Sequence, residues 1–119
     1  MARVLIVDDS VEFGPLLEGF LTRAGHEVRM AHDGREALEM AGWAEAMLLD
    51  LHLPVVDGAE VFRRLRLEPK TSGLPVIFVT GSAEGAPEGP RVGRLRKPFD
   101  PNALVKMIAE LLKPETERP

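Results

Sequence analysis

The sequence contains no cysteine, which excludes a disulfide framework and a zinc site built on thiolates. It also lacks an apolar stretch long enough to cross a membrane, and no secretory signal follows the first methionine. We therefore expect a cytoplasmic protein with no membrane association. Its 15 Lys and Arg are outnumbered by 19 Asp and Glu, and no basic stripe offsets the net charge of −4. Direct binding of nucleic acid is not expected from this charge balance.

What is present fits one folded domain. The chain has 119 residues and 45% hydrophobic content, enough for a substantial core. We place the domain at residues 1–113. Residues 114–119 are polar and bounded by proline, and we interpret them as a tail or the start of a linker.

Short apolar runs alternate with amphipathic segments along the whole chain. This order predicts an α/β fold: a doubly wound, five-stranded parallel sheet with right-handed crossovers and helices on both faces. Strands are expected at residues 3–7, 27–31, 46–49, 76–79 and 94–96, and helices after residue 10 and at residues 35–40, 59–67 and 103–112.

Two helix starts need comment. Asp9 or Ser10 suits the N-cap of the first helix, but Pro15 follows closely, so we expect either a kink or a late start. Asp100 and Pro101 predict the beginning of the last helix. Residues 81–93 carry four Gly and two Pro, so the fourth helix is expected to be short or irregular.

One stretch organises the chemistry of the chain. The apolar run at residues 46–49 ends at Asp50, and a proline and Asp57-Gly58 follow before the next helical pattern. This is typical of a buried strand that presents a carboxylate at its tip and then turns into a loop. In open α/β sheets, ligands bind at these carboxyl ends of the strands.

Polar residues follow four of the five expected strands. Because the carboxyl ends of parallel strands share one edge of the sheet, we expect these residues to converge. The set is Asp8, Asp9, Asp50, Thr80 and Lys97.

The residue types in this set suit one reaction. Three neighbouring carboxylates repel one another and need a cation, and a hard divalent ion such as Mg²⁺ prefers oxygen ligands and accepts a phosphoryl oxygen. Lys97 adds a positive charge and Thr80 a hydroxyl. Together they favour transfer of a phosphoryl group onto Asp50. Taken singly, each residue has an ordinary structural explanation, such as a helix cap or a solvated charge.

The chain resembles the receiver domain of two-component response regulators, the CheY-like family, from Arg3 to Leu112. The resemblance rests on four motifs at strand ends: Val7-Asp8-Asp9, Asp50 to Pro54 with Asp57-Gly58, Thr80-Gly81 and Lys97-Pro98-Phe99. It implies the flavodoxin-like strand order 2-1-3-4-5. It also implies a signalling domain, not a classical enzyme, which catalyses only its own phosphotransfer and autodephosphorylation.

The resemblance also implies roles for the motif residues. Asp50 is expected to be the phosphoacceptor. Mg²⁺ is expected to be held by Asp9, Asp50 and the backbone carbonyl of His52, with Asp8 acting largely through water. The expected phosphoryl contact is Lys97.

Further roles implied by the resemblance concern switching and lifetime. Thr80 is the expected switch hydroxyl, and the Lys97–Pro98 bond is expected to be cis. His52 and Ser82, each two residues past a site residue, are expected to tune dephosphorylation. The partners implied are a sensor histidine kinase or phosphotransfer protein and a downstream effector or fused output domain.

The chain departs from the family pattern at two places. Arg94 stands where family members usually carry an aromatic residue that moves inward on activation, and we expect Arg94 to stay outside. The other departure is the Gly- and Pro-rich stretch at residues 81–93. These departures favour the alternative function, a degenerate receiver that binds a partner without phosphorylation. A flavodoxin-type carrier and an aspartate-based phosphatase fit less well, because Asp8-Asp9 repel a bare phosphate and His52 stands where that phosphatase needs an acid.

Overall fold

The computed structural model describes residues 1–10, 12–81 and 86–113. Five strands form one sheet in the order β2-β1-β3-β4-β5, and every neighbouring pair is parallel. This confirms the expected fold class and strand order. The strands are β1 (Arg3–Val7), β2 (Glu27–Ala31), β3 (Ala46–Leu49), β4 (Val76–Thr80) and β5 (Val92–Arg96).

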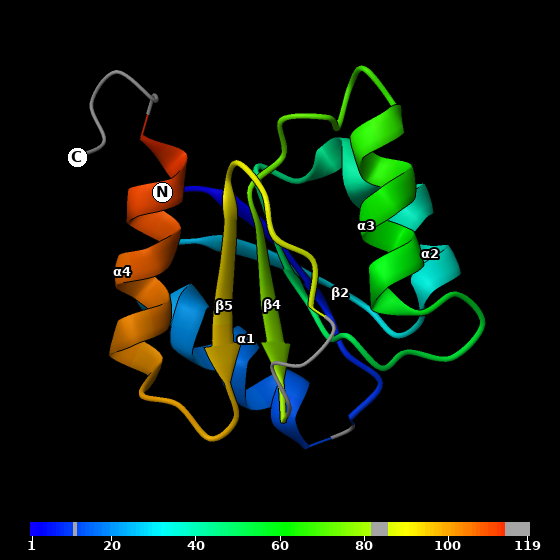
Figure 1. Ribbon diagram of the computed structural model, residues 1–119. Coiled ribbons are helices and arrows are strands. Elements are labelled where there is room, and N and C mark those ends of the chain that lie inside the picture. Colours follow the sequence, from blue (N-terminus) through cyan, green and yellow to red (C-terminus); the bar gives the residue numbers. More distant parts are fainter. Residues whose placement is uncertain (11, 82–85, 114–119) are drawn as a thin grey trace.

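Helices cover both faces of the sheet (Figure 1). On one face lie α1 (Phe13–Arg23) and α4 (Pro101–Leu112); on the other lie α2 (Gly34–Met40) and α3 (Gly58–Leu67), with a short 3₁₀ turn (Ala41–Trp43) after α2. Among the described residues, no helix has the length and apolar character that a membrane crossing requires.

Alternation along the strands divides the core into two layers. In β1, Val4 and Ile6 face α1 and α4, whereas Leu5 and Val7 face α2 and α3. All residues of β3 and β4 are buried, as expected for central parallel strands. Each fully buried aliphatic side chain contributes about 1.5–3 kcal/mol of transfer free energy, so the two layers hold the strand ends firmly in register.

The start of α1 agrees with the expected late start but not with the expected position of the N-cap. The helix begins late, at Phe13, so Pro15 lies in its first turn, where a missing backbone N–H costs little. The residue directly before the helix is Glu12, which makes no side-chain cap, so neither Asp9 nor Ser10 stands at the helix boundary. Ser10, two residues before Glu12, still supplies a side-chain cap, because its Oγ accepts the Phe13 backbone N–H at 3.0 Å.

The other boundaries agree closely with the sequence. The Asp100 carboxylate accepts the Asn102 backbone N–H, with Pro101 as the first residue of α4, as predicted. The fifth strand is longer than expected, because Val92 and Gly93 already pair with Val76 and Ile77 of β4.

The connection between β4 and β5 has no helix in its described part, which comprises residue 81 and residues 86–91. Ala86 is buried in the layer formed with α2 and α3. Ser82, expected to tune dephosphorylation, lies outside the described residues, as does the tail at residues 114–119.

Candidate functional site

The sheet register brings the candidate residues to one edge. Val7 of β1 pairs with Leu49 of β3, so the acids that follow these strands, Asp8 and Asp50, emerge side by side. The Asp50 backbone N–H donates to the Val7 carbonyl at 3.1 Å and extends this pairing by one residue. On the far side of β3, Thr80 pairs with Arg96, which places Lys97 at the same edge.

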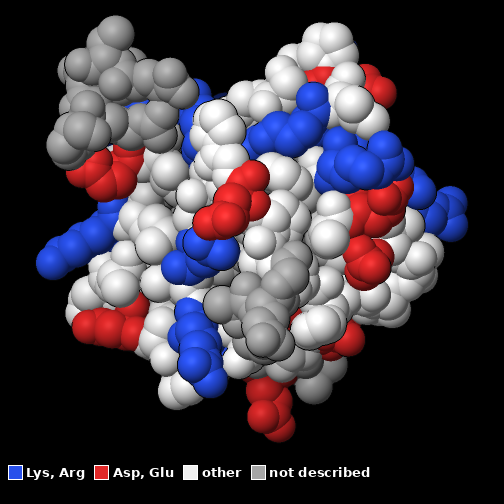
Figure 2. Space-filling model, in the orientation of Figure 1, with Lys and Arg blue, Asp and Glu red and all other residues white. Residues whose placement is uncertain are grey.

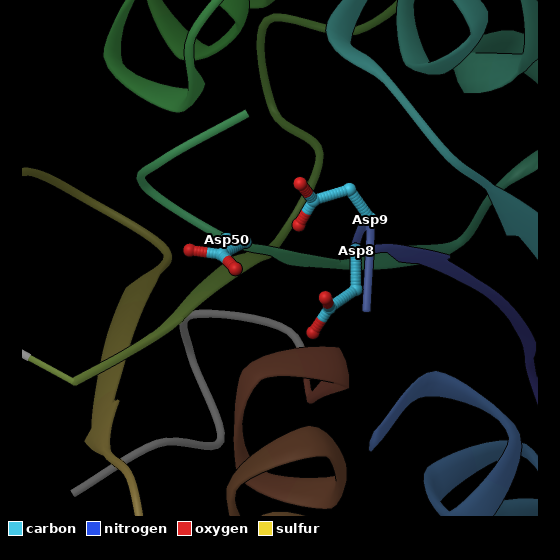
Figure 3. A group of neighbouring side chains, drawn as sticks. All are labelled: Asp8, Asp9 and Asp50. Carbon is cyan, nitrogen blue, oxygen red and sulfur yellow. The ribbon is translucent and has the colours of Figure 1, made fainter. Parts of the chain in front are cut away.

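Three carboxylates meet above this edge. Figure 3 shows Asp8, Asp9 and Asp50 directing their carboxylates into a common space. One oxygen from each lies within 4.8 Å of the other two. Asp8 is 3% exposed, Asp50 is partly buried and Asp9 is exposed, so the cluster is open on the Asp9 side.

Backbone amides fix two of these acids. The Asp8 Oδ1 accepts the Ser10 N–H at 2.8 Å, and the Asp50 Oδ1 accepts the His52 N–H at 3.0 Å. Each bond closes a local turn of the type that aspartate side chains favour. The Oδ2 atoms of Asp8 and Asp50 are the ones that approach Lys97.

The Lys97 ammonium lies between the two fixed acids. Its Nζ is 3.3 Å from Asp8 Oδ2 and 3.5 Å from Asp50 Oδ2. The same Nζ lies 4.3 Å from the ring centroid of Phe13. The Lys97–Pro98 bond is cis, as the resemblance implied.

The remaining predicted residues have distinct positions. Thr80 ends β4, is 2% exposed, and its carbonyl accepts the Lys97 backbone N–H at 2.8 Å. His52 contributes its N–H to Asp50 and has an exposed side chain. Arg94 lies away from the acids: its guanidinium bonds Glu88 at 2.9 Å and its side chain is 42% exposed.

Two features of the site had no assignment from the sequence. Phe13 was assigned no role, although its ring contacts the ammonium of Lys97. Gly58 was interpreted only as a turn residue, but it is buried at the start of α3, where an added Cβ would collide with the Asp50 carbonyl oxygen. The sequence shows only that Phe13 lies at the start of a helix that follows two acids. This pattern is too general to predict a contact between the ring and Lys97.

The donor set fits a hard divalent cation. Three carboxylates supply only oxygen ligands, which Mg²⁺ prefers, and the exposed side of the cluster leaves room for retained waters. The ammonium borders Asp8 and Asp50, and the buried Thr80 ends β4, the strand next to β3. The arrangement therefore pairs a fixed carboxylate with positive charge, as phosphoryl transfer requires.

Charge elsewhere on the molecule is mixed. On the face shown in Figure 2, Lys and Arg side chains are interspersed with Asp and Glu. Arg63 and Arg64, part of a small basic stretch, both bond Glu60, at 2.7 Å and 2.8 Å. The face in view thus presents no continuous basic stripe.

Comparison with known families gives one assignment for most of the chain. Residues 4–109 match the model of the response regulator receiver domain. The match includes the whole sheet except Arg3 of β1, and it includes the three acids, Thr80 and Lys97.

Curated relatives fall into two sizes. An uncharacterized transcriptional regulatory protein, YrkP of Bacillus subtilis, is 36% identical over 116 residues, which cover 92% of this chain and 49% of the relative. Protein PilH of Pseudomonas aeruginosa is 34% identical over 119 residues, covering 94% of this chain and 98% of PilH. The chain thus spans about half the length of several relatives named as transcriptional regulators and nearly all of PilH.

Solved structures of similar chains superpose closely. The receiver domain of sensor histidine kinase PA1611 of Pseudomonas aeruginosa, which has a magnesium ion coordinated in its active-site cleft, gives a TM-score of 0.85 at 26% identity and covers 93% of this chain and 97% of its own. The chemotaxis response regulator CheY4 of Vibrio cholerae gives 0.81 at 32% identity, covering 93% and 98%.

Proposed function

Because this chain belongs to the response regulator receiver family, we propose that Asp50 accepts a phosphoryl group from the phosphohistidine of a sensor histidine kinase or phosphotransfer protein. The observation that carries the proposal is the position of the Asp50 carboxylate. One oxygen is fixed by the His52 N–H, and the other faces Lys97 within a cluster of three acids. No described acid outside this cluster belongs to a comparable group.

The transfer is a displacement at phosphorus. An Asp50 carboxylate oxygen forms the new P–O bond as the P–N bond to the donor imidazole breaks, and the electron pair leaves with the imidazole nitrogen. The Lys97 ammonium is placed to neutralise negative charge on the transferring oxygens. Water later hydrolyses the acyl phosphate, so the domain acts as a phosphoacceptor with its own autodephosphorylation.

The acidic cluster would hold a magnesium ion. Asp9, Asp50 and the His52 backbone carbonyl are the proposed ligands, with Asp8 contributing largely through water. When bound, the ion supplies positive charge that offsets the repulsion between carboxylates and incoming phosphate. Its magnesium-containing relative, the PA1611 receiver domain, supports this assignment.

Switching is proposed to begin at Thr80. This buried residue ends β4, and its hydroxyl is proposed to move toward a new phosphoryl group on Asp50. Its movement would shift the chain that follows and alter binding of a cytoplasmic effector or a fused output domain. His52 borders Asp50 and is proposed, with Ser82, to set the rate of dephosphorylation.

The proposal is tested by labelling with acetyl phosphate and Mg²⁺. Wild-type protein is expected to gain the mass of one phosphoryl group, in a form cleaved by hydroxylamine, and Asp50→Asn is expected to gain none. The matched control is Asp57→Asn, which removes an exposed acid from the same loop while asparagine keeps the helix cap that Asp57 makes to the Glu60 N–H. Labelling that persists in Asp50→Asn removes Asp50 from the role.

A phosphorylation-independent interaction module is the second candidate. The observation that favours it is Arg94, which takes the place of the usual aromatic residue and is bonded to Glu88 instead. Folded wild-type protein that takes no label from acetyl phosphate or from a panel of phosphorylated histidine kinases would support this alternative.

A further inference from the structure

We propose that Phe13 is a positioning residue for phosphotransfer, because its ring holds the Lys97 ammonium beside Asp50. The inference rests on the proposed function of Asp50 and concerns a residue outside the acid, threonine and lysine set. It starts from the contact between Lys97 Nζ and the Phe13 ring, at 4.3 Å from the centroid.

The ammonium has a neighbour on each of three sides. Two are the carboxylates of Asp8 and Asp50, at 3.3 Å and 3.5 Å, and the third is the face of the Phe13 ring. The Lys97 side chain is only 25% exposed, so this contact is partly shielded from water. A cation over an aromatic face within about 6 Å is attracted by the ring quadrupole, more strongly as water is removed.

The ring is itself held by two elements. Phe13 is the first residue of α1, and Phe99, in the loop between β5 and α4, packs its ring against Phe13 at 5.8 Å with an interplanar angle of 82°. This edge-to-face geometry is a favoured one for aromatic pairs. Phe99 lies two residues after Lys97, so the loop that carries the ammonium also carries the ring that orients Phe13.

The contact has a consequence for the reaction. A lysine side chain has four carbons of flexible stem, and an ammonium that leaves the site must be brought back before transfer. A ring attracts the cation without adding a negative charge that would repel the incoming phosphate. Leucine has a similar apolar character but no quadrupole, so replacing Phe13 with leucine isolates this effect.

The first experiment measures the rate of labelling by acetyl phosphate. Phe13→Leu is expected to lower the rate constant about two- to fivefold, the loss that a partly shielded cation–π contact predicts, whereas Phe13→Tyr keeps the ring and the rate. The matched control is Phe20→Leu, because Phe20 lies on α1 and borders the same apolar groove as Phe13. Equal rates for Phe13→Leu and Phe20→Leu would overturn the proposal.

A spectroscopic readout follows the contact directly. The ring current of Phe13 is expected to shift the ¹H signals of the Lys97 ε-methylene upfield in wild type, Phe13→Tyr and Phe20→Leu, and the shift is expected to disappear in Phe13→Leu. An unshifted Lys97 signal in the wild type would overturn the proposal, even if Phe13→Leu is too unstable to assay.

A double-mutant cycle separates positioning from general destabilisation. In a Lys97→Met background, Phe13→Leu is expected to cause no further loss of rate, because the ring has no ammonium left to hold. A further loss equal to that in wild type would contradict the proposal. Failure of the proposed function looks different: wild type then takes no label at all, while the ring-current measurement still decides whether Phe13 holds Lys97.

Discussion

At the scale of single residues, the geometry of Asp50 depends on a glycine in the next element. Gly58 begins α3 and donates its N–H to the Leu51 carbonyl at 2.9 Å. An added Cβ would collide with the Asp50 carbonyl oxygen and would lie 2.8 Å from Leu51 Cα. Backbone atoms cannot rotate away as a flexible side chain can. Any larger residue at position 58 must therefore displace the backbone of Asp50 and Leu51, directly after β3.

Gly58→Ala is therefore expected to affect both stability and reaction. We expect the free energy of unfolding to fall by about 1–3 kcal/mol, as for other overpacked sites. Labelling of Asp50 is expected to slow by up to about a hundredfold, because a displacement near 1 Å is costly at a reacting atom. Urea unfolding and acetyl phosphate labelling measure the two effects.

The control for this change is Gly42→Ala. A Cβ on Gly42 would meet nothing within 4 Å, so stability and labelling are expected to stay close to wild type. If Gly58→Ala has the same stability and labelling rate as Gly42→Ala, the start of α3 does not constrain the backbone at Asp50 and Leu51.

How far the sequence predicts single residues depends on what fixes their position. Asp8, Asp50 and Lys97 follow strands of a parallel sheet, and the position of a strand end follows from the alternation of elements. Phe13 and Gly58 act through side-chain direction and close backbone approach, which depend on how helices pack. No local pattern in the sequence encodes that packing.

At the scale of secondary structure elements, α3 contains a glutamate, Glu60, that forms ion pairs with two arginines of the same helix. Arg63 and Arg64, three and four residues after Glu60, donate hydrogen bonds to the Glu60 carboxylate. These bonds lower the pKa of Glu60 from 4.5 to about 2. The folded state therefore binds the proton less tightly than the unfolded state. The resulting stabilisation is present above about pH 4.5 and is lost as the pH falls toward 2.

Glu60→Gln is expected to remove this pH-dependent contribution. The difference in unfolding free energy between wild type and Glu60→Gln should be constant above pH 4.5 and shrink steadily below it. Urea unfolding between pH 3 and 7 (roughly the range in which linkage acts) measures the difference. Because the group is exposed to solvent, the effect is small.

A second variant checks the cause. With Arg63→Gln and Arg64→Gln combined, the Glu60 carboxylate loses both hydrogen-bond donors, and replacing it by glutamine should then change stability equally at every pH in that range. Parallel stability curves for wild type and Glu60→Gln would contradict the assignment.

Element boundaries were less predictable than element order. The late start of α1 follows from Pro15, but the bond from the Phe13 N–H to Ser10 Oγ shows that the cap lies outside the helix proper. The extra residues of β5 were missed because Val92 and Gly93 belong to the Gly- and Pro-rich stretch at residues 81–93. Pairing with β4 outweighs that weak local preference.

At the scale of the whole molecule, repulsion within the acidic cluster is expected to lower stability when no divalent cation is bound. Asp9 is the most exposed of the three acids and has a ligand atom within 4.8 Å of its neighbours. Removing its charge relieves repulsion of about 1 kcal/mol at the separations found here, with Lys97 offsetting part of the remaining charge. Without divalent ions, Asp9→Asn should therefore be more stable than the wild type.

Asp9→Asn is expected to melt about 3–6 °C above wild type in EDTA. Adding Mg²⁺ should raise the wild-type Tm, because a ligand that binds only the folded state stabilises it by about 2.7 kcal/mol at a hundredfold excess over Kd, and should raise the variant Tm much less. Calorimetry with and without Mg²⁺ measures both quantities.

Net charge alone predicts the same direction for any lost acid, so a second acid provides the control. Glu39 is exposed on α2 and bonds Arg35, away from the cluster. Glu39→Gln should match wild type in EDTA and keep the full response to Mg²⁺. A Tm for Asp9→Asn below that of wild type in EDTA would rule out repulsion within the cluster.

The strand order leaves β2 and β5 as the two outermost strands, each with one row of backbone amides and carbonyls that no strand of the sheet pairs. Both carry exposed charges: Glu27 and Arg29 on β2, and Arg94 and Arg96 on β5. A strand from a second molecule could add to either border only by desolvating these charges, and two copies of β5 would bring like charges together. These charges are therefore expected to disfavour edge-to-edge pairing of the sheet with a second copy.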